Sequence, residues 1–192
     1  MASTKDSEPS EKDSEDRYLP ALARAMVYHP NGNLQDLAKA IGVSKATLYR
    51  FCKTRVELVD RVVFYVGRFC IKAVRNANLQ EVNPTEGLRN LIQNHLDGKD
   101  LILFMVYHWR PEYLSEAHHD HVWIQHEKLT DAFFLKGQEM GVFRLDMSAP
   151  TMTELFYALI AGLVDAEHRG RIPRSALATL LETNIENCIC KR

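Results

Sequence analysis

Apolar residues recur at helical spacing near the amino end of the chain. Leu19, Leu22, Ala23 and Met26 stand at positions i, i+3, i+4 and i+7, which places their side chains on one face of an α-helix. The same spacing returns over residues 34–41 and again over residues 48–52. Helix-breaking residues 29–32 and Gly42 separate the three stretches. We therefore expect three helices in this region, the second of only two turns.

The turn between the second and third helices is very short. Gly42 and Val43 alone precede Ser44, which is a good N-cap for the third helix. Two helices joined by so short a glycine turn must cross steeply, and such a pair packed on a preceding helix is the helix-turn-helix. Its second helix enters the major groove of DNA by its amino-terminal end.

The face of the third helix that points away from the buried stripe carries groups suited to DNA. At about 100° per residue, Ala46 and Arg50 lie opposite Leu48, with Thr47 and Tyr49 on the flanks. Arginine can bind a guanine edge with two hydrogen bonds, and a small alanine lets the helix approach the groove floor. A capping box over residues 54–57 opens a fourth helix, whose first N–H groups and Arg55 are expected to hold a phosphate. The residues expected to contact DNA are Ser44, Lys45, Ala46, Thr47, Tyr49, Arg50 and Arg55.

Positive charge is concentrated in this same segment. The formal net charge is only −1, yet residues 17–75 contain eleven Lys or Arg against three acidic residues. Such a stretch suits a polyanion, although a generic three-helix core with a solvated basic face would have the same charge. Residues 1–16 contain two Lys against six acidic residues and almost no apolar groups, so we expect a disordered acidic tail.

Composition favours a helical protein of the cytoplasm. The chain has 192 residues, of which 46% are hydrophobic, and glycine and proline are scarce. The longest apolar run, residues 101–109, is about half of the ~20 residues that a membrane span needs. Four cysteines without a disulfide-type spacing fit a reducing compartment. We expect a cytoplasmic location and no membrane partner.

Residues 34–58 resemble the DNA-binding domain of TetR-type transcriptional regulators. The resemblance covers about residues 17–70, and it implies a helical carboxy-terminal domain that binds effectors and dimerises. Turn signals after residue 76 mark about five further helices, so the expected fold is all-α with about nine helices. The expected domains are the tail 1–16, the helix-turn-helix domain 17–70 and a ligand-binding and dimerisation domain 71–192. Ala46, Cys52 and Arg55 depart from the common pattern of glycine, a larger apolar residue and lysine, respectively.

Aromatic residues gather where the resemblance implies an effector cavity. Residues 101–134 contain seven of the seventeen aromatic residues, including both tryptophans. An apolar pocket with few polar groups is the usual form of a small-molecule site, although each aromatic could instead belong to the plain core. The residues expected to bind a small, largely apolar or aromatic effector are Phe104, Tyr107, His108, Trp123, His126 and Phe133.

Six of the eight histidines lie between residues 95 and 126, and His118, His119 and His121 invite a metal-sensor interpretation. No cysteine accompanies these three, and adjacent side chains on a helix diverge by about 100°. Most histidines of this stretch are more simply explained as exposed polar residues. The other explanation is that His108 or His126 contacts the effector. We therefore expect no metal and no cofactor.

The last two predicted helices, near 150–168 and 173–190, have wide apolar stripes that can bury more than one neighbour. A helix pair of this kind can meet its two-fold copy in a four-helix interface and place two reading helices about 34 Å apart. The residues expected at this interface are Leu155, Leu159, Leu163, Leu177 and Leu181.

These features predict a homodimeric, ligand-responsive repressor that binds a palindromic operator in double-stranded DNA and is released by a small effector. A constitutive DNA-binding regulator without an effector is one alternative, and a small enzyme that uses a histidine is the other. The chain has no phosphate-binding glycine loop, no nucleophile motif and no HExxH or CxxC motif. We therefore expect that it is not an enzyme.

Overall fold

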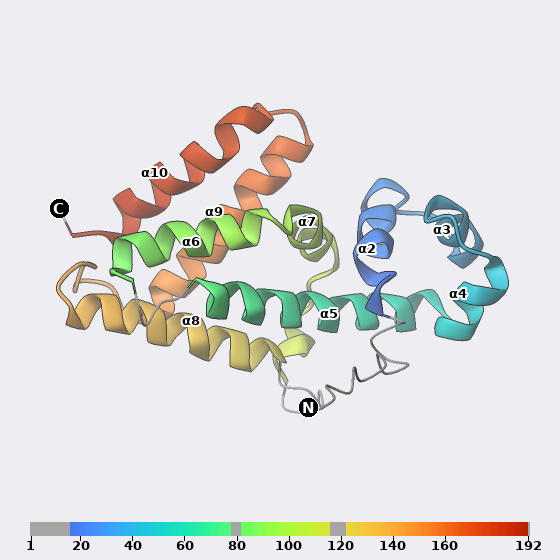
Figure 1. Ribbon diagram of the computed structural model, residues 1–192, viewed down its shortest axis with the longest axis horizontal. Helices are drawn as coiled ribbons and strands as arrows, with labels where there is room; N and C mark the ends of the chain where they lie inside the picture. The colour runs from blue at the N-terminus through green and yellow to red at the C-terminus, as the bar shows by residue number, and fades with distance from the viewer. Residues whose placement is uncertain (1–15, 78–81, 116–121, 192) are drawn as a thin grey trace, which may run out of the picture. The chain divides into compact units, whose positions relative to one another are not determined.

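The computed structural model of the chain describes residues 16–77, 82–115 and 122–191. Within these ranges the chain forms nine α-helices and two short 3-10 turns, and it contains no β-strand (Figure 1). The helices are α2 (Leu19–Tyr28), α3 (Leu34–Ala40), α4 (Lys45–Phe51), α5 (Arg55–Asn76), α6 (Pro84–Leu96), α7 (Lys99–His108), α8 (Val122–Glu139), α9 (Ala149–His168) and α10 (Leu177–Ile189). The 3-10 turns are η1 (Pro111–Leu114) and η2 (Arg174–Ala176). This confirms the all-α fold class.

The chain divides into two compact units within α5. The first unit ends at Tyr65, five residues before the domain end expected at residue 70, and the second begins at Val66. Of the tail expected over 1–16, residues 1–15 lie outside the described residues.

The first unit contains α2, α3, α4 and the beginning of α5 around a small apolar core. Leu22, Met26 and Leu37 are fully buried in it. At the start of α3, the Asn33 side chain accepts hydrogen bonds from two backbone N–H groups, and Asp36 Oδ2 accepts from the Asn33 N–H at 3.0 Å. This reciprocal capping stabilises a helix of only seven residues.

The start of α5 is capped differently from the expectation. Thr54 Oγ1 accepts from the Glu57 N–H at 3.1 Å, as a capping box requires. The Glu57 carboxylate, however, accepts from the Lys53 N–H at 2.8 Å, one residue before the expected donor. This bond and Arg61 lower the pKa of Glu57.

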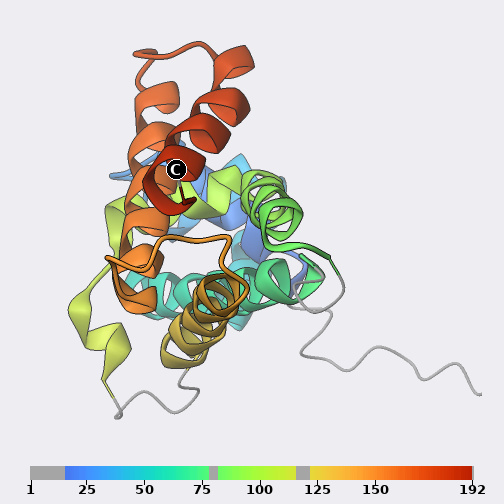
Figure 2. The same cartoon turned by 90° about the vertical axis from the view of Figure 1, so that its left-hand side faces the viewer.

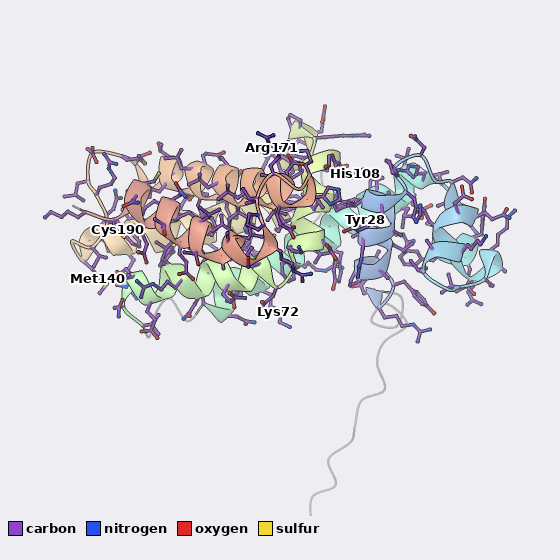
Figure 3. The ribbon with its side chains drawn as sticks, turned by 90° about the horizontal axis from the view of Figure 1, so that it is seen from above. Tyr28, Lys72, His108, Met140, Arg171 and Cys190 are labelled. Carbon is purple, nitrogen blue, oxygen red and sulfur yellow. The ribbon has the colours of Figure 1, made fainter. Side chains whose placement is uncertain are left out.

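The second unit contains the rest of α5 and helices α6 to α10. Helix α9 packs against α7, α8 and α10, and Figure 2 shows α9 and α10 side by side. Phe134, Phe143 and Phe156 are fully buried between α8, α9 and the connection that follows α8. Met140 and Cys190 lie at the same end of this unit in Figure 3, where Phe143 and Cys190 form an isolated antiparallel bridge.

No helix among the described residues is long and apolar enough to span a membrane.

Candidate nucleic-acid interface and ligand cavity

Helix α4 turns one face into the core and the other toward solvent. Ser44 Oγ accepts from the Thr47 N–H at 3.0 Å and so caps the helix. Leu48 and Phe51 are buried, as the spacing predicts. The expected DNA-contacting residues of this helix that are exposed are Lys45, Ala46, Tyr49 and Arg50.

The chemistry of this exposed face suits a DNA groove. Lys45 Nζ lies 5.4 Å from the centre of the Tyr49 ring, so the two side chains share one flank of the helix. Thr47 is half-buried, and its hydroxyl lies 2.8 Å from Ser44 Oγ. Arg50 is exposed at the carboxy-terminal turn of α4 and presents a guanidinium fork. DNA contact by these residues remains a prediction.

Arg55 has a structural role that the sequence did not reveal. Its Nη1 donates to the Gly32 carbonyl at 2.6 Å, and its Nη2 donates to the Pro30 carbonyl at 2.7 Å. These bonds connect the turn before α3 to the first residue of α5. Much of the guanidinium expected to hold a phosphate is therefore already occupied by backbone carbonyls.

The second unit contains a cavity of about 480 Å³. Side chains of α5, α7, η1, α8 and α9 form its wall, and most of them are apolar or aromatic. The lining residues are Cys70, Ile102, Met105, Val106, Trp109, Leu114, Trp123, His126, Glu127, Glu154, Tyr157, Ile160 and Ala161. Its size and its mixture of aromatic walls with few polar groups are typical of a small-molecule site.

The structure places only two of the six expected effector residues, Trp123 and His126, on the cavity wall. Phe104 is fully buried and stacks on His108 with 4.2 Å between the ring centres. His108 is half-buried, and its Nδ1 lies 3.0 Å from the Phe104 carbonyl oxygen. Neither Phe104 nor His108 is among the lining residues.

The remaining two expected residues also lie elsewhere. Tyr107 is half-exposed, and its hydroxyl donates to Asp165 at 3.0 Å. Phe133 is buried in the core, with its ring centre 5.5 Å from that of Phe143. The expectation that Phe104, Tyr107, His108 and Phe133 line the cavity is therefore wrong.

A periodicity in α7 could have identified the correct face. Ile102, Met105, Val106 and Trp109 follow the spacing i, i+3, i+4 and i+7, and all four line the cavity. Phe104, Tyr107 and His108, which were expected from the aromatic and histidine content of the segment, project from other faces of the helix. On α8 the same rule relates Trp123 to His126 and Glu127.

Two carboxylates of the cavity wall were not among the residues expected from the sequence. Glu127 on α8 and Glu154 on α9 both line it, and neither forms an ion pair with a described residue. Partial burial raises the pKa of Glu127, and the negative charges of Glu154 and Asp131 raise it further. The cavity is therefore favourable for positive charge.

Beside these acids lies a polar network of buried His126 and Thr130 with half-buried Tyr157. The Tyr157 hydroxyl is hydrogen-bonded to His126 Nε2, and it lies 2.9 Å from Thr130 Oγ1. Burial and the neighbouring His95 lower the pKa of His126 to about 3, while burial lowers that of His95 to about 4. Both imidazoles are therefore neutral near pH 7.

The expected interface residues separate into two groups. Leu177 and Leu181 are buried within the unit itself, so they cannot contact a second copy, and this part of the expectation is wrong. Their stripe packs α10 against its own neighbours. The α9 residues expected at the interface remain half-buried, namely Leu155, Leu159 and Leu163.

His118, His119 and His121, for which exposed polar residues were the favoured explanation over a metal sensor, lie outside the described residues.

A helix-turn-helix with an exposed basic reading helix, together with a second helical unit, defines a DNA-binding transcription regulator. The chain is 42% identical over 168 residues to the regulator NfxB of Pseudomonas aeruginosa, with 88% of this chain and 90% of NfxB covered. It is 29% identical over 184 residues to the repressor LfrR of Mycolicibacterium smegmatis, with 89% of this chain and 87% of LfrR covered. No protein-family model matches the chain.

Solved structures share the fold of this chain. LfrR in complex with proflavine superposes with a TM-score of 0.72 at 19% identity, covering 91% of this chain and 96% of that one. A Saccharomonospora viridis regulator in complex with choline has a TM-score of 0.64 at 18% identity, with 95% and 100% covered. The chain belongs to the TetR-type family of transcriptional regulators.

Proposed function

We propose that the protein is a homodimeric repressor that binds a palindromic operator and is released by an aromatic cation bound in the cavity of the second unit. The observation that supports this ligand class most directly is the pair of carboxylates, Glu127 and Glu154, in a wall rich in aromatic rings. Aromatic faces attract cations, and a carboxylate without an ion-pair partner is stabilised by one. This refines the expected effector from apolar or aromatic to aromatic and positively charged.

Two tryptophans give the cavity its shape for a flat ligand. The rings of Trp109 and Trp123 lie 5.1 Å apart, nearly perpendicular to each other. Trp123 Nε1 is buried and has no hydrogen-bond partner among the described residues, so it can donate to a ligand acceptor. A planar ring can stack on one indole and contact the edge of the other. LfrR in complex with proflavine, which is a planar aromatic cation, supports the same ligand class.

DNA binding is assigned to α4 of each subunit. Lys45, Ala46, Tyr49 and Arg50 form its exposed face, with Arg50 as the base-reading group and Lys45 as a phosphate or base contact. Two copies related by a two-fold axis would read the two halves of a palindrome.

Dimerisation is assigned to the outward face of α9. Leu155, Leu159 and Leu163 are half-buried in the single chain, and no atom lies within 4 Å of a Cβ built on Gly162. A second copy packed against this apolar face would bury it and complete a four-helix interface.

Proflavine fluorescence titration tests the ligand assignment without DNA. We expect saturable binding to the wild type, and a loss of affinity of about tenfold or more in Glu127→Gln and in Glu154→Gln, because each removes one charged partner. Glu139→Gln is the matched control, since Glu139 is exposed on the same helix α8 and does not line the cavity. Equal affinities in all four proteins would overturn the assignment, and absence of binding would favour the constitutive regulator.

A further inference from the structure

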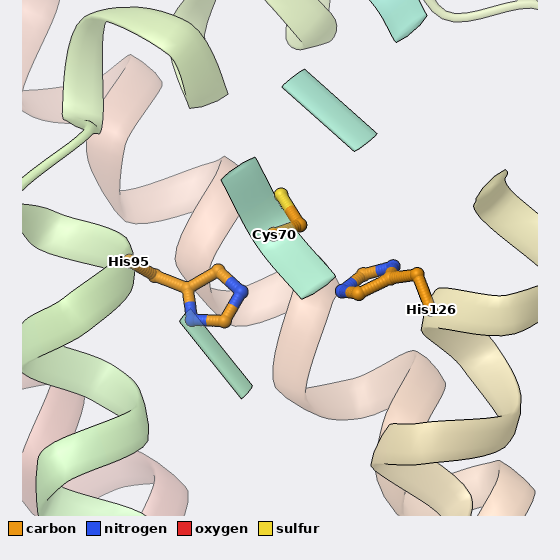
Figure 4. Close-up of side chains that lie close together, drawn as sticks. All are labelled: Cys70, His95 and His126. Atoms are coloured by element: carbon orange, nitrogen blue, oxygen red, sulfur yellow. The ribbon is translucent and has the colours of Figure 1, made fainter. Parts of the chain in front are cut away.

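Three buried side chains with metal-binding atoms meet beside the cavity. Cys70 comes from α5, His95 from α6 and His126 from α8, and one donor atom of each lies within 4.8 Å of the other two. Figure 4 shows the two imidazole rings on either side of Cys70. All three residues belong to the second unit, and none of them is among His118, His119 and His121, whose spacing invited the metal-sensor interpretation.

The hydrogen bonding of His95 is that of a typical metal-binding histidine. Its Nδ1 lies 2.7 Å from the Leu91 carbonyl oxygen, and because a carbonyl only accepts, Nδ1 carries the proton. Nε2 therefore has the free lone pair, and it is buried with no hydrogen-bond partner among the described residues. Metal-bound histidines typically donate their other N–H to a backbone carbonyl in this way.

His126 is held in place by a neighbouring hydroxyl. Tyr157 is hydrogen-bonded to its Nε2, the ring nitrogen that faces His95 in Figure 4, so a bound metal ion would take the place of this hydrogen bond. The ring is 3% exposed, and its centre lies 6.3 Å from that of His95.

We propose that Cys70, His95 and His126 form a binding site for a single copper(I) ion. One sulfur and two imidazole nitrogens in a three-fold arrangement are a donor set suited to copper, whereas structural zinc sites use four ligands. On binding, a Cu–S bond forms and the Cys70 S–H bond breaks, and the proton passes to water in the cavity that Cys70 lines. The copper(I) ion carries the same single positive charge as the proton that leaves, so the buried site stays neutral. No electron is transferred. A divalent ion would leave an added charge in an apolar site.

This site does not depend on the proposed regulatory function, because its test needs neither DNA nor an organic ligand. Copper(I) is titrated anaerobically into the full chain in competition with a chromogenic copper(I) chelator. Cys188 and Cys190, which are half-buried and separated by one residue, could bind copper themselves, so both are changed to serine in every protein tested. Cys52, buried in the first unit, is changed to alanine in the control variant.

We expect the background protein and the Cys52→Ala control to bind one copper(I) ion per chain. Loss of an outer-shell partner alone typically weakens a metal site about 10- to 100-fold, so removing a ligand in Cys70→Ala should weaken binding by at least about 100-fold. His95→Gln keeps the side chain polar while removing the ring nitrogens, and it should show a similar loss even if Cys70→Ala fails to fold. Unchanged affinity in a folded Cys70→Ala or His95→Gln variant, no copper bound by the background protein, or retention of zinc(II) in preference to copper(I) would overturn the proposal.

Discussion

Arg55 donates from its guanidinium to the carbonyl oxygen of Gly32 at 2.6 Å, so the first residue of α5 is bonded to the turn that precedes α3. The second arm of the same side chain binds the Pro30 carbonyl. Because α4 lies between α3 and α5 in the chain, this connection restrains the segment that presents the reading helix. Arg55 therefore stabilises the first unit as well as being a candidate phosphate contact.

Replacing Arg55 by alanine should lower the free energy of unfolding of the first unit. Two charge-assisted hydrogen bonds at a partly exposed site suggest a loss of about 1–2 kcal/mol. Urea denaturation followed by circular dichroism measures this change. Arg50→Ala is the control, because an exposed side chain without such bonds should change stability by less than about 0.5 kcal/mol. Equal stability of the two variants would show that the Arg55 bonds contribute nothing.

Arg50→Ala should instead change DNA recognition. Loss of a base contact costs about 1–3 kcal/mol and relaxes preference at one step of each half-site. Titrations on matched and mismatched duplexes at two salt concentrations measure specificity and salt dependence together. Arg55→Ala, compared at matched folded fraction, should weaken all sequences alike and flatten the salt dependence. If both variants lose specificity equally, the assignment of the two roles is wrong.

Leu159→Glu should yield monomers with much weaker operator binding. The change places a charge in the apolar face of α9 that we assign to the dimer, and burying an unpaired charge is costly. Sedimentation velocity reports the oligomeric state. Leu145→Glu provides the comparison, because Leu145 is 75% exposed and lies outside α9. A dimer that persists in Leu159→Glu would move the interface away from this face.

Gly137→Ala should destabilise the second unit. A Cβ at this position in α8 would lie 2.0 Å from the Phe143 ring, which is fully buried and cannot move aside. The overpacking should cost about 1–3 kcal/mol, more than the helix propensity gained. Thermal unfolding compares it with the wild type, which should be the more stable protein. The reverse order of stabilities would contradict this packing.

The helices were predictable because local signals agree with the fold. Ser44 caps α4 as its position predicts, Asn33 caps α3, and Gly42 adopts the positive φ of 74° that ends α3. The exposed face of α4 follows from the helical period once Leu48 is assigned to the core. These features depend on residues close together in the chain.

The cavity was predicted only in part because its wall joins distant segments. Glu154 and Cys70 have no local feature that marks them as cavity residues, and only the packing of α5, α7, α8 and α9 brings them together. Leu181 illustrates the opposite error, since a wide apolar stripe on α10 did not distinguish the core of its own chain from a partner. The two carbonyl partners of Arg55 could not be read from the sequence, because they depend on the fold of the turn at 29–32.

Operator release by an aromatic cation tests the central claim most directly. DNA affinity is measured with and without proflavine for the wild type and for the double variant Glu127→Gln, Glu154→Gln. Free proflavine interacts with the DNA equally in both titrations, so only the difference between the proteins reports the cavity. We predict that the two proteins bind DNA equally without proflavine, and that proflavine weakens the wild type about tenfold or more beyond the double variant, which corresponds to about 1.4 kcal/mol of coupling. The same proflavine effect on both proteins would contradict control of DNA binding from this cavity.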